Sequence, residues 1–388
     1  MPNSIITKGM RLVGNCYDKI LISHRRNTEI KKFKDERRIE IYSRTVLTES
    51  QMKAIDDLYL SNYGEKIPYI WHRYFTAYTG NFDVNYFPEL IGIPEFERFM
   101  NLYNGYDKVF ADKNVLPFIA KSAGIKVPET IFSATRGTYK DNGLNMLTRS
   151  ESVEFLKDIG EGFMKPSVDS CSGQGCCFIN FDNGVDTVSG KTVSEILTDM
   201  GNDFVIQRRI KCHKSFTDIY PGSVNTFRIR TYRWKEGIEH IPSIMRIGSG
   251  GGFVDNAHAG GMFVAVDDDG TYHDTAFTEF NTQFKEHPDT HFVFDGYNNP
   301  LFVKALKAAK RMHAVIPQIG VIHWDFTLGE DGEPILIEAN TYGGGFWSSQ
   351  MSHGRSAFGD KTAEVLRWMR VMKKTKPEDR HKIAYGQL

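Results

Sequence analysis

The sequence of 388 residues contains few cysteines, and they are not arranged in a way that suggests a disulfide framework. The five cysteines are odd in number, and no two are spaced as a CxxC pair: Cys16, Cys171, Cys176, Cys177 and Cys212. Disulfide-rich secreted domains and thiolate zinc sites both need paired cysteines. The cysteine pattern therefore favours a reducing, cytoplasmic location.

Net charge and long apolar runs are also missing. The 48 basic and 48 acidic residues cancel, and the sequence pI is about 7.2, so the whole chain carries no field that would attract nucleic acid. No stretch approaches the roughly 18 apolar residues of a membrane span, and the N-terminus lacks the apolar core of a signal peptide. We expect neither a nucleic-acid partner nor an integral membrane segment.

The most informative stretch runs from Gly320 to Asn340, where two β-rich runs flank the dipeptide Asp331-Gly332. Such a dipeptide favours a tight hairpin, and we expect it to form the two-residue turn. Counting outward from this turn predicts two facing pairs, Asp325 with Glu338 and His323 with Asn340. Because side chains alternate along a strand, the other face is expected to be core and carries Ile322, Trp324, Phe326, Ile335 and Ile337.

Two carboxylates that face each other weaken a sheet unless a positive charge lies between them. Oxygen ligands on a rigid sheet suit Mg²⁺, which commonly takes one or two carboxylates and completes its shell with water and phosphate oxygens. The pattern thus favours a nucleotide-bound Mg²⁺ site at Asp325, Glu338 and Asn340. The alternative is a solvated hairpin face whose acidic residues only aid solubility.

A second candidate site combines a lysine with a flexible loop. A short strand ends at Lys165-Pro166, and Ser167 to Gly175 follows with several serines and glycines. Backbone N–H groups of such a loop can surround phosphate oxygens, and the lysine adds a point charge. The spacing differs from that of a P-loop, so an ordinary hairpin loop is the alternative.

Two further strands carry arginines. In the first, Phe227 and Ile229 point to one face while Arg228 and Arg230 point to the other, where they would attract anions. The second strand, Ile241 to Ile247, carries Arg246 and leads to a glycine-rich stretch. Several antiparallel strands are therefore expected to bring basic side chains toward the acidic hairpin.

The order of these residues resembles the ATP-grasp superfamily, and it is most similar to the sugar-transfer-associated ATP-grasp family. The resemblance covers about residues 106 to 366. It rests on Lys113 before a helix, Lys165-Pro166 with its glycine loop, Gln207 with His213, Ser223-Val-Asn-Thr-Phe-Arg228, Val254-Asp255-Asn256, Gly260-Gly261, His323-Trp324-Asp325 and Glu338-x-Asn340.

The resemblance implies an α+β fold in which two α+β subdomains with antiparallel sheets grip ATP. A mostly helical region over residues 1–105 would come first. The small ATP-grasp subdomain would cover residues 106–203, and the large subdomain with the metal hairpin would cover residues 204–388.

Site roles also follow from the resemblance, residue by residue. ATP phosphates would meet Lys113 and Lys165, with the loop of Ser172, Gly173 and Gly175 folded over them. Adenine would meet Gln207 and the backbone from Arg208 to Ile210, and the ribose would lie near His213. Mg²⁺ would bind Asp325, Glu338 and Asn340, and the transferred phosphate would be stabilised by Arg246 and Arg228.

The implied activity is amide formation between a carboxylate and an amine, with ATP and Mg²⁺ as cofactors and an acylphosphate as intermediate. The family name suggests an amino acid or amino sugar and a carboxylate such as a hexuronic acid, in surface polysaccharide synthesis. Two alternatives stay open, a kinase of the same fold and a nucleotide-binding regulator without turnover. The oligomeric state is not predicted.

Overall fold

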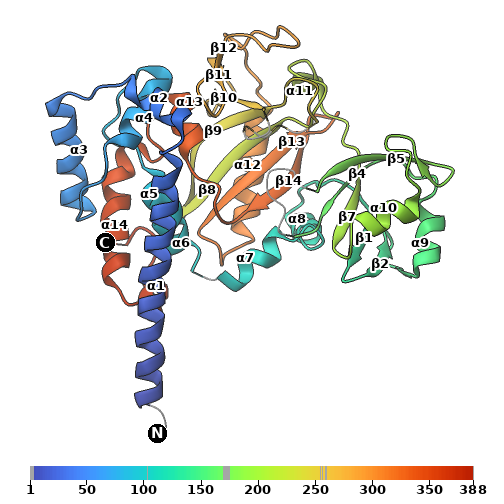
Figure 1. Ribbon diagram of the computed structural model, residues 1–388, viewed down its shortest axis with the longest axis horizontal. Coiled ribbons are helices and arrows are strands. Elements are labelled where there is room, and N and C mark those ends of the chain that lie inside the picture. The colour runs from blue at the N-terminus through green and yellow to red at the C-terminus, as the bar shows by residue number, and fades with distance from the viewer. Residues whose placement is uncertain are drawn as a thin grey trace.

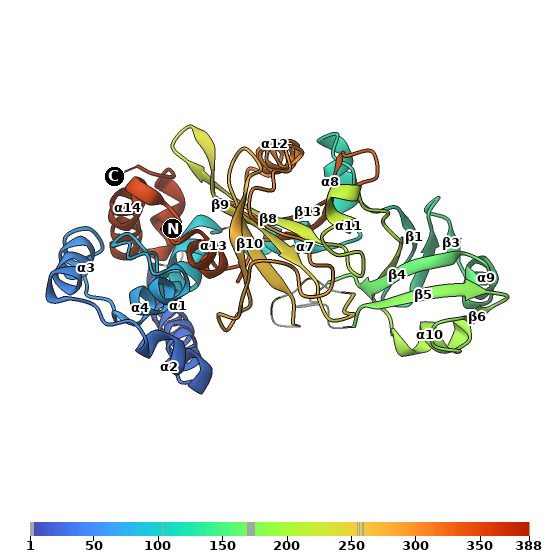
Figure 2. The same ribbon diagram turned by 90° about the horizontal axis from the view of Figure 1, so that it is seen from above.

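The computed structural model describes residues 4–102, 104–168, 175–253, 255, 257 and 260–387. Three regions follow one another along the longest axis of the molecule (Figure 1): a helical body, a large sheet and a smaller sheet. The same arrangement is seen from above, with the two sheets beside each other (Figure 2). The protein is a mixed α+β structure with antiparallel sheets, as expected.

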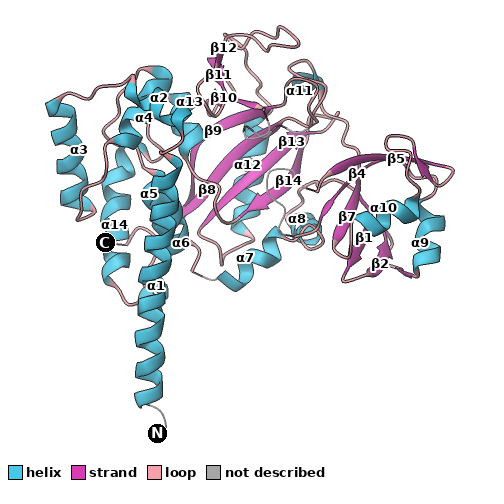
Figure 3. Cartoon of the chain, in the orientation of Figure 1, coloured by secondary structure: helices cyan, strands magenta, loops and turns pink. Residues whose placement is uncertain are grey.

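The helical body combines the two ends of the chain, although they are far apart in sequence. Its N-terminal part comprises α1 (Ser4–Lys32), α2 (Glu36–Ser43), α3 (Glu49–Asn62), α4 (Ile70–Thr79), α5 (Glu89–Ile91), the π-helical turn η1 (Gly92–Glu97) and α6 (Arg98–Met100). Its C-terminal part comprises α13 (Trp347–His353), η3 (Gly359–Lys361), α14 (Thr362–Lys374) and η4 (Pro377–Lys382). In Figure 3, α14 lies between α3 and α1, so the C-terminal helices complete the N-terminal bundle.

The smaller sheet has the strand order β3-β2-β1-β7-β4-β5-β6. These strands are β1 (Thr130–Thr135), β2 (Thr138–Asp141), β3 (Met146–Leu147), β4 (Gly160–Pro166), β5 (Cys177–Asp182), β6 (Val185–Asp186) and β7 (Phe204–Arg208). Two helices, α9 (Arg149–Leu156) and α10 (Val193–Asp199), pack on it, and α7 (Asn104–Ala111) and α8 (Leu116–Ser122) precede it. Because β7 pairs with β1 and β4, the chain leaves this sheet after Arg208 rather than at the expected boundary of residue 203.

The large sheet has the strand order β12-β11-β10-β9-β8-β13-β14. Its strands are β8 (Thr226–Trp234), β9 (Gly237–Ile247), β10 (Met262–Val266), β11 (Tyr272–Phe277), β12 (Gln283–Phe284), β13 (Val321–Leu328) and β14 (Pro334–Asn340). The short helix α11 (Lys214–Thr217) precedes β8, and α12 (Phe302–Ala314) precedes β13. A membrane-crossing helix is not found in the part of the chain that the structure describes.

The two faces of β8 show how the alternating sequence divides the core from the site. Phe227 and Ile229 are fully buried on the face that packs against α12. Arg230 on the other face donates hydrogen bonds to Ser348 and Ser349 of α13. The large sheet therefore has an apolar face under α12 and a polar face toward α13, as the alternation predicts.

Local signals in the sequence also position the helices. Thr48 caps α3 in a reciprocal capping box with Gln51. The aromatic residues of α4 form core: Trp71, Tyr74, Phe75 and Tyr78 are all at most 3% exposed. They belong to the same cluster as residues of α14 and the large sheet.

The hairpin of β13 and β14 has the predicted pairs, but it reaches them in a different way. Gly329 pairs with Glu333, so the turn contains three residues instead of the expected two. A bulge between Asp325 and Phe326 then shifts the register back by one residue. Asp325 consequently faces Glu338, and His323 faces Asn340, as predicted.

The bulge makes one part of the core prediction wrong. Between the turn and the bulge the alternation of β14 is reversed, so Leu336 is buried opposite Phe326; beyond the bulge, Ala339 is buried opposite Trp324 in the expected register. Ile335 and Ile337, expected in the core, are only partly buried. Ile337 instead lines the cavity described below. Alternation alone could not reveal the extra residue.

Candidate active site

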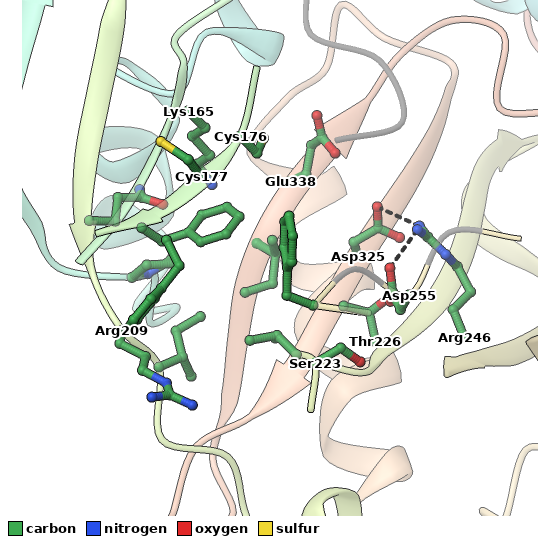
Figure 4. Close-up of a pocket in the computed structure, with 18 of the residues that line it drawn as sticks. Lys165, Cys176, Cys177, Arg209, Ser223, Thr226, Arg246, Asp255, Asp325 and Glu338 are labelled. Atoms are coloured by element: carbon green, nitrogen blue, oxygen red, sulfur yellow. Dashed lines mark hydrogen bonds and ion pairs between the residues drawn. The ribbon is translucent and has the colours of Figure 1, made fainter. Parts of the chain in front are cut away.

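A cavity of about 1500 Å³ lies between the two sheets and is lined from both of them. Figure 4 shows Lys165 and the two adjacent cysteines on one side, with Glu338, Asp325 and Arg246 on the other. Most of the residues expected at the site line this cavity: Lys113, Lys165, Gln207, Arg208, Ile210, Arg228, Arg246, Asp325, Glu338 and Asn340. The fold thus joins basic strands and the acidic hairpin, as the sequence predicts.

Lys113 and Lys165 form the basic end of the cavity. The backbone N–H of Lys113 donates to the carbonyl of Ser167 just beyond β4, at 3.0 Å, which holds the two lysine-bearing segments together. Burial lowers the pKa of Lys165 to about 8, although Glu338 raises it; the nearby charge of Lys113 lowers it further. An anion bound between these two buried ammonium groups would offset their mutual repulsion.

Asp325 lies between two arginines. It pairs across the strands with Arg228, whose Nε and Nη2 donate to its carboxylate at 2.5 and 3.0 Å. Arg246 donates to the same carboxylate at 3.2 Å and to Asp255 at 2.6 Å (Figure 4). Burial alone would raise the pKa of Asp325, but the attraction of Arg228 and Arg246 outweighs it and the pKa is lowered.

The positive charge that relieves the facing carboxylates is therefore supplied, at least in part, by arginines. This corrects the sequence argument that a bound cation is needed to explain the pair. The residues nevertheless fit Mg²⁺, because they offer carboxylate and amide oxygens on adjacent strands. Glu338 is 3.7 Å from the Nζ of Lys113 and 30% exposed in its side chain, and the amide of Asn340 lies 3.4 Å from Asp325.

The glycine loop is only partly within the described residues. Ser172 and Gly173, which are predicted to contact phosphate, lie outside them. Gly175 has a φ of 72°, and a Cβ there would come 3.0 Å from Pro166, so its backbone favours glycine. Cys176 directly after it lines the cavity beside Lys165.

The expected adenine residues lie at and just beyond the C-terminal end of β7, the central strand of the smaller sheet. Gln207 is buried in β7 opposite Phe163, and both line the cavity with Ile210. His213 is not brought to the cavity, whose described lining includes its neighbours Lys211 and Cys212. Its ring instead caps α11 by accepting from the N–H of Ser215. The structure gives the predicted ribose role of His213 no support.

A group of buried acidic residues was missed by the sequence analysis. Glu97 accepts from the N–H groups of Gly343 and Gly345 at 2.7 and 3.1 Å, and Glu89 accepts from that of Phe346 at 2.7 Å. They hold residues 343–346, which follow β14; Gly343 and Gly344 line the cavity, and we refer to residues 343–346 as its wall. The available signal was acidic residues inside an otherwise apolar stretch, residues 87–100.

His323 shows how tightly this wall packs. The ring is fully buried, and its Nε2 lies 3.1 Å from Glu97. A Cβ at Gly344 would come 2.4 Å from the ring, so any larger residue there would displace it. His323 thus lies on the polar face as predicted, but it supports the wall and does not line the cavity.

Two antiparallel sheets that enclose a cavity with paired lysines and an acidic hairpin define the ATP-grasp class of proteins. The family model of sugar-transfer associated ATP-grasp proteins matches residues 94–365. Since this match covers most of the chain, the protein belongs to that family. No curated protein sequence matches the chain closely enough to count as a relative.

Solved structures with a similar fold are distant in sequence. An L-amino acid ligase from Bacillus licheniformis is 14% identical, with a TM-score of 0.37, 67% of this chain and 48% of that chain covered. A D-alanine–D-alanine ligase from Bacillus anthracis complexed with ATP is 14% identical, with a TM-score of 0.38. The match covers 71% of this chain and 68% of that chain. The chain thus spans about half the length of the first of these.

Proposed function

We propose that the protein is an ATP-dependent ligase that joins a carboxylate to an amine through an acylphosphate. One observation carries this proposal: a single cavity holds two buried lysines, Lys165 on β4 of the smaller sheet and Lys113 in the turn before α8, and faces an arginine-flanked acidic hairpin on the large sheet. Phosphoryl transfer is catalysed mainly by position and charge compensation, and this cavity offers both signs of charge.

In this proposal Lys113 and Lys165 bind the phosphates of ATP. Gln207 and the backbone of Arg208 to Ile210 contact the base, and Ser172, Gly173 and Gly175 cover the phosphates. Asp325, Glu338 and Asn340 hold Mg²⁺, which would neutralise phosphate oxygens when bound.

The proposed reaction has two steps. A carboxylate oxygen of the acceptor attacks the γ-phosphorus of ATP, and the bond from that phosphorus to the bridging oxygen of ADP breaks. Arg246 and Arg228 stabilise the charge that develops on the transferred phosphate. The amine nitrogen then attacks the acyl carbon, phosphate leaves with the bonding electrons, and the nitrogen loses a proton as the amide forms.

The proposed substrates are a carboxylate such as a hexuronic acid and an amine such as an amino acid or amino sugar. The family's association with sugar transfer supports this choice. So do the aromatic residues Phe253, Phe263, Tyr342 and Trp347, which line the cavity and could stack on a sugar ring. The proposal includes a cytoplasmic location, where ATP is available, and a role in surface polysaccharide synthesis.

The test is a screen for ADP release against pools of uronic acids, each with and without pools of amino acids and amino sugars. We expect ADP release only when a suitable carboxylate and a suitable amine are both present. The product should have the mass of the amide that joins them. The matched control is Glu338→Gln, which should abolish release. A stable phosphorylated hydroxyl product that forms without an amine would replace the ligase by a kinase.

A further inference from the structure

A second cluster of ligating side chains lies away from the cavity, at the far end of the large sheet. Asp267 follows β10, His273 lies in β11, and His353 is the last residue of α13. One ligand atom from each residue can be chosen so that all three lie within 4.8 Å of one another. None of the three lines the cavity between the sheets.

The buried histidine is oriented as metal ligands usually are. The side chain of His353 is fully buried, and its Nε2 is 2.7 Å from the carbonyl oxygen of Ser243. Since a carbonyl only accepts, Nε2 must carry the proton, which leaves Nδ1 with a lone pair. Among the described residues Nδ1 has no hydrogen-bond partner, and it lies 3.7 Å from Asp267. A backbone carbonyl that fixes the tautomer in this way is typical around bound metals.

The distances between the three groups also suit a small metal ion. Nε2 of His273 lies 3.2 Å from the Asp267 carboxylate, and the ring centroids of His273 and His353 are 4.8 Å apart. Tetrahedral zinc with bonds of about 2.0–2.1 Å to nitrogen and oxygen separates its ligand atoms by roughly 3.3 Å. The cluster therefore needs only small side-chain adjustments to close around an ion.

One contact opposes binding. Nη2 of Arg355 lies 3.3 Å from Asp267, so a metal would have to share the carboxylate with a guanidinium. The hydrogen bond between His273 and Asp267 also offers a purely structural explanation for part of the cluster. That explanation does not account for the buried, unpartnered Nδ1 of His353.

We propose that Asp267, His273 and His353 form a binding site for a borderline divalent transition metal such as Zn²⁺. Two imidazole nitrogens and one carboxylate select this class over Mg²⁺, which prefers oxygen alone. Three protein ligands leave a fourth position for water. The ion would tie the end of α13 to the β10–β11 hairpin, while the start of α13 contributes Trp347 and Ser348 to the cavity wall.

The test uses the full-length protein after chelator treatment, titrated with Zn²⁺ in competition with a chromophoric chelator and with Co²⁺ by visible spectroscopy. His273→Ala removes the most accessible nitrogen ligand. His291→Ala is the matched control, because its ring is 74% exposed and pairs only with Glu286 among the described residues. Circular dichroism and the metal-free unfolding midpoint show whether each variant is folded.

We expect one equivalent of Zn²⁺ to bind the wild-type protein and the His291→Ala variant, with a rise of a few degrees in the unfolding midpoint. His273→Ala should weaken binding at least tenfold and abolish the Co²⁺ absorption band of a tetrahedral site. Arg355→Ala should bind at least as tightly as the wild type, because an opposing charge is gone. Equal binding by His273→Ala and the wild type, or no binding by the wild type, would overturn the proposal.

Discussion

The carboxylate of Asp325 contacts two guanidinium groups, so substituting it tests structure and chemistry together. Removing it would leave Arg228 without both of the hydrogen bonds that it makes to this residue. Glu338, on the facing strand, is more exposed and only loosely paired. At the scale of single residues, Glu338 is therefore the cleaner probe of the proposed metal site.

The first prediction compares these two carboxylates. Asp325→Ala should lower the free energy of unfolding by about 3 kcal/mol or more, because it leaves buried charge uncompensated. Glu338→Gln should lower it by less than about 1 kcal/mol and still abolish Mg²⁺-dependent ATP turnover. Chemical denaturation and an ADP assay measure the two effects. Normal turnover in a folded Glu338→Gln variant would remove this residue from the site.

The second prediction concerns Lys165, whose pKa is lowered to about 8 by burial. Phosphate binds the protonated lysine, so ATP affinity should be highest and constant below pH 8. Above pH 8 the affinity should fall, and the fall should approach about tenfold per pH unit. Calorimetry in buffers of different ionisation enthalpy should show proton uptake on ATP binding above pH 8.

Two variants control this prediction. Lys165→Met should weaken ATP binding more than adenosine binding and remove the pH dependence, because the phosphate charge loses its partner. Lys157→Met, on an exposed lysine paired with Glu154, should leave both unchanged. A wild-type ATP affinity that stays constant from pH 7 to pH 10 would contradict the assignment.

Strand alternation predicted that Arg228 and Asp325 face the same region, because both lie on strands whose faces can be counted. Lys165, which also lines the cavity, was singled out by the glycine-rich loop that follows it. His213 could not be placed in this way. It lies in a loop where no periodicity constrains direction, and its ring serves as a helix cap.

At the scale of elements, the hairpin and the wall of residues 343–346 determine the shape of the cavity. The hairpin pairs were predictable because the three-residue turn and the bulge cancel. The exposure of Ile337 was not, since a bulge has no signature in an alternating apolar pattern. The wall depends on Glu89 and Glu97, which come from a separate part of the chain.

The third prediction tests this wall. Burial raises the pKa of Glu89 to about 8; Glu29 and Glu97 raise it further, whereas the N–H of Phe346 and the charge of Lys32 lower it. An acid whose folded-state pKa is raised holds a proton that the unfolded chain releases, so its contribution to stability falls between about pH 4.5 and pH 8.

Glu89→Gln keeps an oxygen acceptor for Phe346 but cannot ionise. Its free energy of unfolding, relative to the wild type, should therefore rise steadily from pH 5.5 to pH 8.5. Denaturant unfolding at several pH values measures this difference. A difference that is independent of pH would show that Glu89 does not hold the extra proton.

At the scale of the whole molecule, the helical body supports the hairpin that lines the cavity. The buried amide of Asn101 donates to the carbonyls of Val321 and Thr341 at 2.9 and 2.6 Å, and it accepts from the N–H groups of Gly320 and Val321. It therefore joins the N-terminal region to the first residue of β13 and to the residue that follows β14. No sequence period reveals such a contact, because it depends on tertiary structure.

The fourth prediction is that Asn101→Asp destabilises the protein by about 2–4 kcal/mol. The substitution replaces two N–H donors by an acceptor that faces two carbonyl oxygens in a buried site. Asn142→Asp, at an exposed turn, should change the stability by less than about 0.5 kcal/mol. Equal stabilities of the two variants in denaturant unfolding would mean that the helical body is not joined through this amide.

We propose above that the cavity activates a carboxylate as an acylphosphate. The most direct measurement is hydroxylamine trapping with ATP and each carboxylate pool in the absence of amine, followed by mass spectrometry. We expect a hydroxamate formed in proportion to ADP, and Arg246→Ala should lower trapping with little change in ATP affinity. ADP formation without hydroxamate or amide, together with a stable phosphorylated hydroxyl product, would contradict it.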